Sequence, residues 1–274
     1  MHKRGLRRTH FSMSAEPPDR AGRRQASSSA APHICGYERG LRPGLASTHR
    51  APATSHILKR VLSVVASERV GAYTLLRIQR GGLEPGVPGQ FFMIEAPGRV
   101  LPRPMSLCLA PPGELGFLFE PIGPGTRALA TLSPGDSLGV LGPLGNGFRL
   151  DVGRPLLVGG GIGMAPFPYL SEALGRPPAI LGFRSDLHAE AAKLVPNAEV
   201  VVEPTRVTEI LEPGYDVLAC GPEPMLEAVA GLAPRAQLAW EAPMACGYGA
   251  CYGCVVEIEG QYKRLCVEGP VLAA

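Results

Sequence analysis

Four cysteines near the end of the chain have the spacing of a metal or iron–sulfur site. The stretch EAPMACGYGACYGCVVEIEGQYKRLC holds them at gaps of four, two and eleven residues, as Cys246, Cys251, Cys254 and Cys266. Four thiolates can ligate either zinc or an iron–sulfur cluster. Zinc ribbons usually carry two CxxC pairs and this chain has one, so the spacing favours a [2Fe–2S] cluster over structural zinc. The chemistry predicted is electron transfer.

The glycines between these cysteines support the same interpretation. Gly247, Gly249 and Gly253 alternate with the first three thiols. Glycine adopts positive φ without steric cost, so backbone amides can approach inorganic sulfide. The residues from Cys254 to Cys266 are expected to form a short hairpin that returns the fourth thiolate to the loop.

A second set of residues has the chemistry to hold nucleotide phosphates. In LLVGGGIGMAPF the glycines follow an apolar run and precede an expected helix, where amides can meet a pyrophosphate. Tight packing of a strand against a helix is the alternative, because the spacing is not GxGxxG. A later apolar run ends in Cys220 and Gly221, at the edge where open α/β sheets bind ligands, although a buried structural cysteine is the commoner case. The glycines are Gly159, Gly160, Gly161 and Gly163.

Two further segments combine polar groups with rigid turns. One offers a guanidinium and a hydroxyl suited to a phosphate or an isoalloxazine edge; a solvated strand rim is the alternative. This first segment comprises Arg103, Pro104, Met105 and Ser106. The other, with Gly125 and Thr126, precedes an expected helix and could offer amides to a phosphate, or be an ordinary capped turn.

The elements that must position these residues fall into three segments. Short apolar runs bounded by Gly or Pro fill residues 57–150, which predicts a small antiparallel β-barrel. In residues 151–239 buried runs alternate with helical stretches, which predicts an α/β domain with a parallel sheet. Residues 240–274 form the cysteine segment. Ahead of them, residues 1–56 carry ten Arg or Lys against three Asp or Glu and no hydrophobic periodicity, so a disordered basic extension is expected.

Composition excludes several classes of protein. No apolar run approaches the roughly 20 residues that a spanning helix needs, so no membrane partner is expected. The basic extension has almost no aromatic side chains to stack on bases, so no nucleic-acid partner is expected. Seven cysteines, four of them clustered, argue against a disulfide framework and for a reducing, cytoplasmic location.

Together these motifs resemble the ferredoxin reductase superfamily, and within it the family of electron-transfer subunits of class 1B dihydroorotate dehydrogenases. The resemblance covers about residues 59–274 and is most specific in MACGYGACYGC, YKRLC and GPVL. It implies a flavin domain that binds FAD, an NAD-binding domain, and a [2Fe–2S] cluster on the four cysteines. By position, residues 103–106 match the flavin-binding strand, Gly125 and Thr126 the flavin phosphate turn, residues 159–163 the dinucleotide loop, and Cys220 with Gly221 the pair beside the nicotinamide.

The resemblance also implies a function. A cluster passes single electrons and nicotinamide accepts a hydride, so a flavin must stand between them. Electrons from dihydroorotate would leave the flavin of an FMN-containing catalytic subunit and reach NAD through this chain, in the synthesis of UMP. A heterotetramer of two such chains with two catalytic subunits is expected. No catalytic residue is assigned here, because hydride transfer is the work of FAD.

Some alternatives stay open in the sequence. The chain could serve another NAD(P)H-linked flavin and iron–sulfur oxidoreductase, such as an NAD(P)H:ferredoxin or hydrogenase-type assembly, or be a zinc-bound module without flavin. Two residues depart from the family pattern: Met105 stands where relatives often have an aromatic residue or Ile, and Glu120 stands near a position that is often basic. Arg206, in a compact stretch after Val202, leaves the choice between NAD and NADP undecided.

Overall fold

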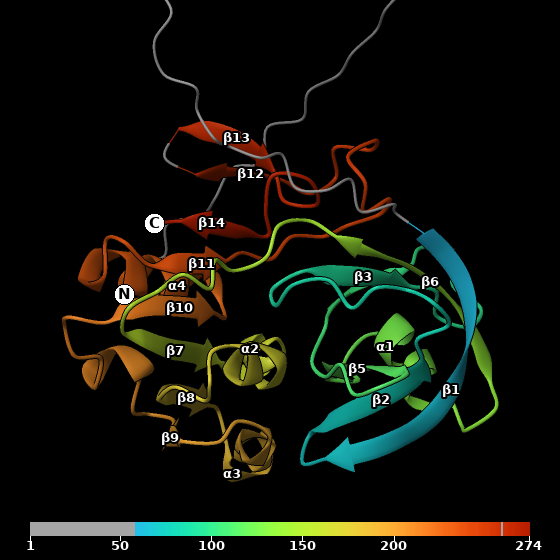
Figure 1. Cartoon of the computed structure of the whole chain (residues 1–274), viewed down its shortest axis with the longest axis horizontal. Helices are drawn as coiled ribbons and strands as arrows, with labels where there is room; N and C mark the ends of the chain where they lie inside the picture. The colour runs from blue at the N-terminus through green and yellow to red at the C-terminus, as the bar shows by residue number, and fades with distance from the viewer. Residues whose placement is uncertain (1–57, 259) are drawn as a thin grey trace, which may run out of the picture. The chain divides into compact units, whose positions relative to one another are not determined.

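The computed structural model describes residues 58–258 and 260–274, so the basic extension predicted for residues 1–56 lies outside the described part of the chain. Its first portion is a six-stranded antiparallel sheet with the order β4-β3-β6-β1-β2-β5 (Figure 1). The strands are β1 (Leu58–Val70), β2 (Tyr73–Gln79), β3 (Phe91–Ile94), β4 (Arg103–Ser106), β5 (Glu114–Phe119) and β6 (Ser137–Leu144).

This sheet curls into a nearly closed barrel. Leu109, just beyond the edge strand β4, forms an antiparallel bridge with Gly116 of the other edge strand, β5. Helix α1 (Pro124–Ala130) packs its buried Leu129 into the barrel core, where Phe92 and Phe117 meet edge to face at 5.6 Å. A barrel with a capped, filled interior removes exposed strand edges and fixes its loops. The predicted β-barrel is therefore confirmed.

The second portion is a mainly parallel sheet with the order β14-β11-β10-β7-β8-β9. Its strands are β7 (Pro155–Gly160), β8 (Ala179–Phe183), β9 (Ala198–Val202), β10 (Asp216–Cys220), β11 (Gln237–Ala239) and β14 (Val271–Ala273). Counted from β7, the order read from the other edge is 3-2-1-4-5-6, that of dinucleotide-binding sheets, which bind their ligand beyond the carboxyl ends of the strands where the order reverses. The predicted α/β portion is confirmed.

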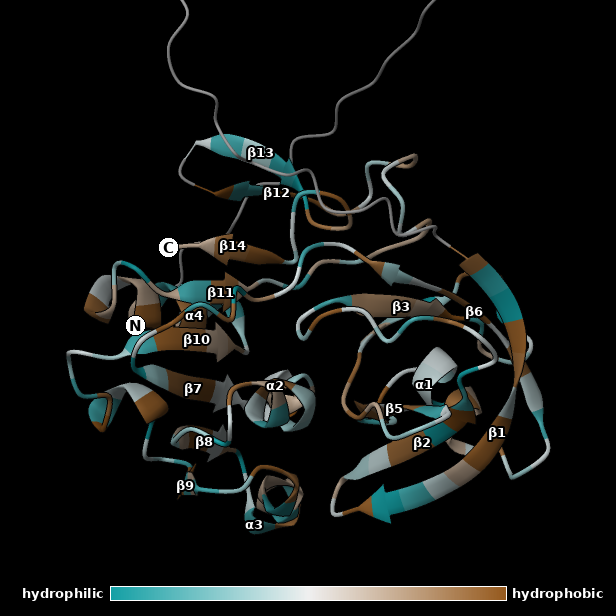
Figure 2. Ribbon diagram, viewed as in Figure 1, coloured by the Kyte–Doolittle hydropathy of each residue, from teal (hydrophilic) through white to brown (hydrophobic). Residues whose placement is uncertain are grey.

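Helices cover both faces of this sheet because its side chains alternate. Leu157 and Leu218 pack with α2 (Phe167–Ala173), whereas Leu156 and Val217 pack with α4 (Glu223–Leu232). The central strands β7 and β10 are accordingly brown in Figure 2, as expected for strands buried on both faces. The shorter helices are η1 (Gly161–Met164), α3 (Asp186–Ala189), η2 (Glu190–Leu194) and η3 (Val207–Glu209).

The cysteine segment contains one hairpin, formed by β12 (Val255–Ile258) and β13 (Gln261–Arg264). After it the chain returns to the α/β sheet, where β14 runs antiparallel to β11. Within the described residues, no helix is both long enough and apolar enough to cross a membrane.

Candidate redox and nucleotide sites

The hairpin of the cysteine segment brings two of the predicted ligands together. Cys254 directly precedes β12 and Cys266 follows β13, so the pairing of Val255 with Arg264 carries both cysteines to the open end of the hairpin. Their Sγ atoms lie 3.2 Å apart and both side chains are buried. Cys246 is half-buried and Cys251 is exposed.

Backbone amides of the loop point at the sulfur atoms. The amide of Gly253 lies 3.4 Å from Sγ of Cys251, and that of Cys266 lies 3.5 Å from Sγ of Cys254. Gly247 and Gly249 have φ of 80° and 87°, the left-handed conformation that tight loops require. Gly247 is also tightly packed, since a Cβ there would lie 3.0 Å from Sδ of Met93 in the barrel.

Other backbone amides of the loop donate hydrogen bonds to the Cys246 thiol. Burial raises the pKa of this thiol, but hydrogen bonds from the amides of Tyr248, Cys251 and Ala250 and from the Cys251 side chain outweigh it and lower the pKa to about 6. Burial, followed by the neighbouring Cys254, raises the pKa of Cys266 to about 12. The thiols thus form two pairs, 246 with 251 and 254 with 266. Among the described residues, no three potential ligands already stand close enough to hold a metal ion.

A cavity of about 640 Å³ lies along the carboxyl ends of the parallel strands. The end of β7 and the start of η1 form one wall with Gly160, Gly161 and Gly163, and Gly221 contributes from just beyond the end of β10. A Cβ on Gly163 would lie 2.6 Å from the carbonyl carbon of Cys220, and one on Gly160 2.6 Å from Sδ of Met225. The glycines are therefore needed for close packing as well as for access to a ligand.

The remaining predicted dinucleotide residues lie beneath this wall. Gly159 of β7 is paired with Cys220 of β10 in the parallel register, so the structure places these two positions side by side. Cys220 is buried, which raises the pKa of its thiol well above the usual value, with a further contribution from Glu241. A neutral, buried thiol suits the packing role for a cysteine.

Sequence reasoning missed Glu241, which lines the same cavity. Burial raises the pKa of its carboxyl group. The available signal was its position two residues beyond the short strand β11, at the same edge of the sheet as Gly161 and Gly221.

The predicted flavin residues come together on the barrel. In the pairing of β3 with β4, Met105 opposes Phe92 and is buried, and Ser106 opposes Phe91. The Arg103 guanidinium donates to the carbonyls of Leu101 at 3.1 Å and Pro102 at 3.2 Å, and it packs on Gly125, 22 residues later. Pro104 opposes Met93.

Helix α1 begins at Pro124, so Gly125 and Thr126 lie in its first turn and not ahead of it as the sequence predicted, and the Thr126 hydroxyl is used within that turn. Oγ1 of Thr126 accepts from the Gly123 amide at 3.1 Å and lies 3.2 Å from the Gly123 carbonyl, which fixes the start of the helix. Thr126 thus caps the turn that holds Gly125 against Arg103.

A polar network, also absent from the sequence interpretation, joins the barrel to the α/β portion. Glu120, after β5, forms an ion pair with Arg184, after β8, and lies 3.3 Å from Nε2 of His188. The His188 ring meets Tyr73 of the barrel edge to face at 5.5 Å. Burial, and then the charge of Glu120, raises the pKa of Tyr73 to about 12. All four residues line the large cavity.

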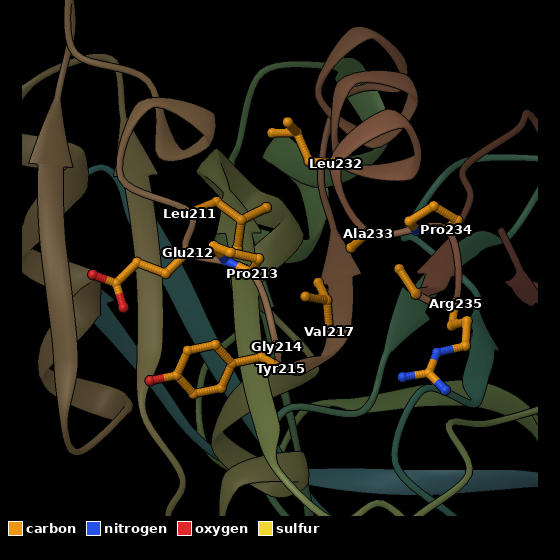
Figure 3. Close-up of a pocket in the computed structure, with 11 residues that line it drawn as sticks. Leu211, Glu212, Pro213, Gly214, Tyr215, Val217, Leu232, Ala233, Pro234 and Arg235 are labelled. Atoms are coloured by element: carbon orange, nitrogen blue, oxygen red, sulfur yellow. The ribbon is translucent and has the colours of Figure 1, made fainter.

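A second cavity, of about 340 Å³, lies among the residues between η3 and β10 and those after α4 (Figure 3). Its walls include Tyr215 and Arg235, and Arg154 stacks on the Tyr215 ring at 4.0 Å. None of the residues predicted from the sequence to bind a cofactor lines it.

Comparison with known proteins places these features in one family. Residues 241–274 match the sequence model of the iron–sulfur cluster binding domain of dihydroorotate dehydrogenase B. The dihydroorotate dehydrogenase B (NAD(+)) electron transfer subunit of Bacillus caldolyticus is 36% identical over 252 residues, which cover 80% of this chain and 98% of that protein. The chain belongs to this family of electron transfer subunits. That of Clostridium perfringens is 37% identical over 67% of this chain and 83% of its own length.

Solved structures show the same fold at lower identity. An NADH-dependent reduced ferredoxin–NADP oxidoreductase superposes with a TM-score of 0.67 at 24% identity, covering 77% of this chain and 87% of that one. A ferredoxin NADP+ reductase from Neisseria gonorrhoeae, solved with FAD and NADP bound, has a TM-score of 0.52 at 17% identity, over 64% and 92% of the two chains. The predicted family and the predicted barrel and α/β fold are both confirmed.

As a member of this electron transfer family, the chain is an oxidoreductase subunit that works with a catalytic partner. The donor set fits the groups that the fold implies. Thiols with amides directed at them suit iron and sulfide, a glycine wall at the carboxyl edge suits a pyrophosphate, and the Arg103 guanidinium held over Gly125 suits a flavin phosphate or ring edge.

Proposed function

We propose that this chain carries electrons from the catalytic subunit of a dihydroorotate dehydrogenase to NAD+, with FAD and a [2Fe–2S] cluster as its redox groups, in the synthesis of UMP. The observation that carries the proposal is the alignment with the Bacillus caldolyticus subunit, which extends over 98% of that protein and includes the cysteine segment. FAD, when bound, exchanges a hydride with nicotinamide and single electrons with an iron–sulfur cluster.

The residues of the cysteine segment would hold the cluster as thiolates. Cys254 and Cys266 supply a buried pair, and the low pKa of Cys246 makes its thiolate available at neutral pH. Amides directed at sulfur stabilise negative charge and thereby tune a cluster's potential. Cys251 is exposed, so a cluster held here would lie close to the surface of the chain on the side of this residue.

The barrel and the sheet would position the other two groups. Arg103, pinned by two carbonyls, presents its guanidinium beside Gly125, where a flavin phosphate would accept from it. Gly161 and its neighbours leave room for a pyrophosphate beyond the end of β7. We propose that residues 103–106 and 125–126 contact FAD and that residues 159–163 and 220–221 contact NAD. Residues 57–150, 151–239 and 240–274 correspond to the FAD, NAD and cluster portions.

The catalytic subunit, which we take to contain FMN, would dock on the face around Cys251. Aromatic and aliphatic side chains that are unusually exposed surround this cysteine in the sequence, and exposed tyrosines are enriched in binding interfaces. They are Tyr248, Tyr252, Val255, Tyr262 and Val267. Two such chains with two catalytic subunits, in the cytoplasm, is the assembly we propose.

A visible absorption spectrum of the anaerobically purified full chain tests the proposal. Flavin bands with a broad cluster shoulder, bleached by NADH, are expected. A colourless protein that contains zinc and takes up no flavin on reconstitution would contradict it. Co-expression with a dihydroorotate dehydrogenase catalytic chain, followed by mass determination and a dihydroorotate-dependent NAD+ reduction assay, distinguishes this function from that of another ferredoxin-linked reductase.

A further inference from the structure

An arginine stands where dinucleotide-binding sheets read the adenosine ribose. Arg184 follows β8, the strand next to the glycine-rich strand β7, about twenty residues after Gly163. In sheets with this strand order, an acidic residue in that region binds a free 2′-hydroxyl and an arginine accommodates a 2′-phosphate. Arg184 alone would therefore favour NADP.

The structure shows that this guanidinium is already occupied. Its Nη2 forms an ion pair with Oε1 of Glu120, which comes from the barrel. Its Nε donates to Nε2 of His188 at 2.9 Å. Because a guanidinium only donates, Nε2 of His188 accepts, and Nδ1–H donates to Oγ of Ser185 at 2.7 Å. Two edges of the guanidinium are thus held in place.

The pair is asymmetric in burial. The side chain of Glu120 is 17% exposed and that of Arg184 is 59% exposed. Because an unpaired buried charge costs free energy, the largely buried carboxylate of Glu120 is expected to keep its ion pair with Arg184. Arg184 is therefore directed toward Glu120, and the carboxylate brings its own negative charge to the wall of the cavity.

Other charges at this end of the cavity point the same way. Glu203, directly after β9, lines it, so a 2′-phosphate would meet two carboxylates. Arg206 also lines the cavity, so it is the other cation that could bind a 2′-phosphate in place of Arg184. A ribose with a free 2′-hydroxyl can donate to such carboxylates, whereas a phosphate is repelled by them.

We propose that Glu120 sets a preference for NAD+ over NADP+ by occupying Arg184, so that the two residues form a specificity-determining pair. The inference rests on the proposed dinucleotide site and goes beyond it by naming what selects the cofactor. It also gives a role to Glu120, the residue that departs from the basic pattern of the family.

Calorimetric titration of the full, cofactor-loaded protein with NAD+ and with NADP+ tests the pair. Glu120→Gln should strengthen NADP+ binding about tenfold, the effect of one charge-assisted hydrogen bond, and should not strengthen NAD+ binding, so the ratio of the two affinities shifts toward NADP+. Glu114→Gln is the matched control, because Glu114 also pairs with an arginine, Arg77 at 3.0 Å, elsewhere on the barrel. It should leave the ratio of the two affinities unchanged.

The double variant Glu120→Gln with Arg184→Gln identifies the cation. It should lose the gain in NADP+ affinity; retention of that gain would assign the phosphate to Arg206 and overturn the proposal. An unchanged ratio in Glu120→Gln would overturn it too, whereas failure of the unaltered protein to bind NAD+ would contradict the proposed function itself. If Glu120→Gln does not fold, Glu120→Asp replaces it, because the aspartate keeps the charge but reaches less far toward Arg184. The ratio of NADP+ to NAD+ affinity should then rise by a smaller factor, and an unchanged ratio would contradict the proposed role of Glu120 and Arg184.

Discussion

The guanidinium of Arg103 covers the Cα of Gly125, and a Cβ at that position would lie 2.7 Å from its Cζ atom. The contact joins β4 to the first turn of α1, two elements that the sequence separates by the whole of β5. Gly125 adopts no positive φ, so it is required by this contact and by no strain of the backbone. The Arg103 guanidinium can therefore keep its position only while residue 125 is glycine.

Gly125→Ala should therefore displace Arg103 and weaken FAD binding about tenfold, as expected when one charge-assisted hydrogen bond is lost. Flavin content and the dissociation constant of FAD measure the effect. Gly123→Ala is the matched control, because a Cβ there meets only Oγ1 of Thr126, at 4.0 Å. Equal FAD affinity in the two variants would show that Arg103 does not hold the flavin.

Gly163→Ala should damage the dinucleotide site. Its Cβ would press on the carbonyl carbon of Cys220 at 2.6 Å, and overpacking of this kind costs about 1–3 kcal/mol of the free energy of unfolding. Urea unfolding and NAD+ titration report the two effects. Gly231→Ala, in α4 with no atom within 4 Å of its Cβ, should leave NAD+ binding intact and raise stability by roughly 0.5–1 kcal/mol. A Gly163→Ala protein with unaltered NAD+ affinity would remove this loop from the site.

Cys254→Ala should abolish the cluster while FAD remains bound. Iron and sulfide content, together with the electron paramagnetic resonance of the reduced protein, provide the measurement. Cys108→Ala is the control, since Cys108 is buried in a core that contains none of the four cysteines of the loop. That variant should keep its iron. Full iron content in Cys254→Ala would show that the ligand set is different.

After removal of iron, Cys246 should be the thiol that iodoacetamide alkylates first. Its pKa is lowered to about 6, so the thiolate dominates above that pH and the alkylation rate should fall as the pH is lowered through 6. Buried Cys108 has a strongly raised pKa and should react only on unfolding. Peptide mapping of the alkylated protein over about pH 5–10, a range that includes the ordinary thiol pKa of about 8.5, measures both rates. A midpoint near the ordinary thiol pKa would show that the loop amides do not act on Cys246.

Tyr262→Ser should weaken binding of the catalytic subunit about tenfold, because exposed tyrosines that become buried in an interface often contribute most of its affinity. Tyr262 is 74% exposed on the hairpin. Val100→Ser, in the loop ahead of β4, alters an even more exposed apolar residue outside the cysteine segment and should have no effect. Affinity measured by surface plasmon resonance distinguishes them, and equal losses in both would place the docking face elsewhere.

Local sequence patterns predicted much of this molecule. Apolar runs bounded by Gly and Pro are sufficient to indicate the barrel, and alternating runs and helices indicate the sheet. The gap between Cys254 and Cys266 indicated a hairpin, and the structure places their sulfur atoms 3.2 Å apart. Each of these signals lies within a short stretch of sequence.

The features that sequence reasoning missed depend on contacts between distant segments. Glu120 and Arg184 are 64 residues apart, and each taken alone indicates an ordinary surface charge. Glu241 follows a strand of only three residues, too short to give a clear pattern. The return of β14 to the sheet required knowledge of which edge of β11 was open.

The pairing of β11 with β14 defines how the cysteine segment is joined to the α/β sheet. These antiparallel strands flank residues 240–270, the part of the cysteine segment that holds all four cysteines, and the amide of Trp240 donates to the carbonyl of Pro270 at 3.0 Å, so the two ends of this part meet. The segment is topologically an enlarged β-turn. Replacing residues 241–269 with a short turn should therefore leave the barrel and the α/β sheet folded and return a protein that binds FAD but holds no cluster.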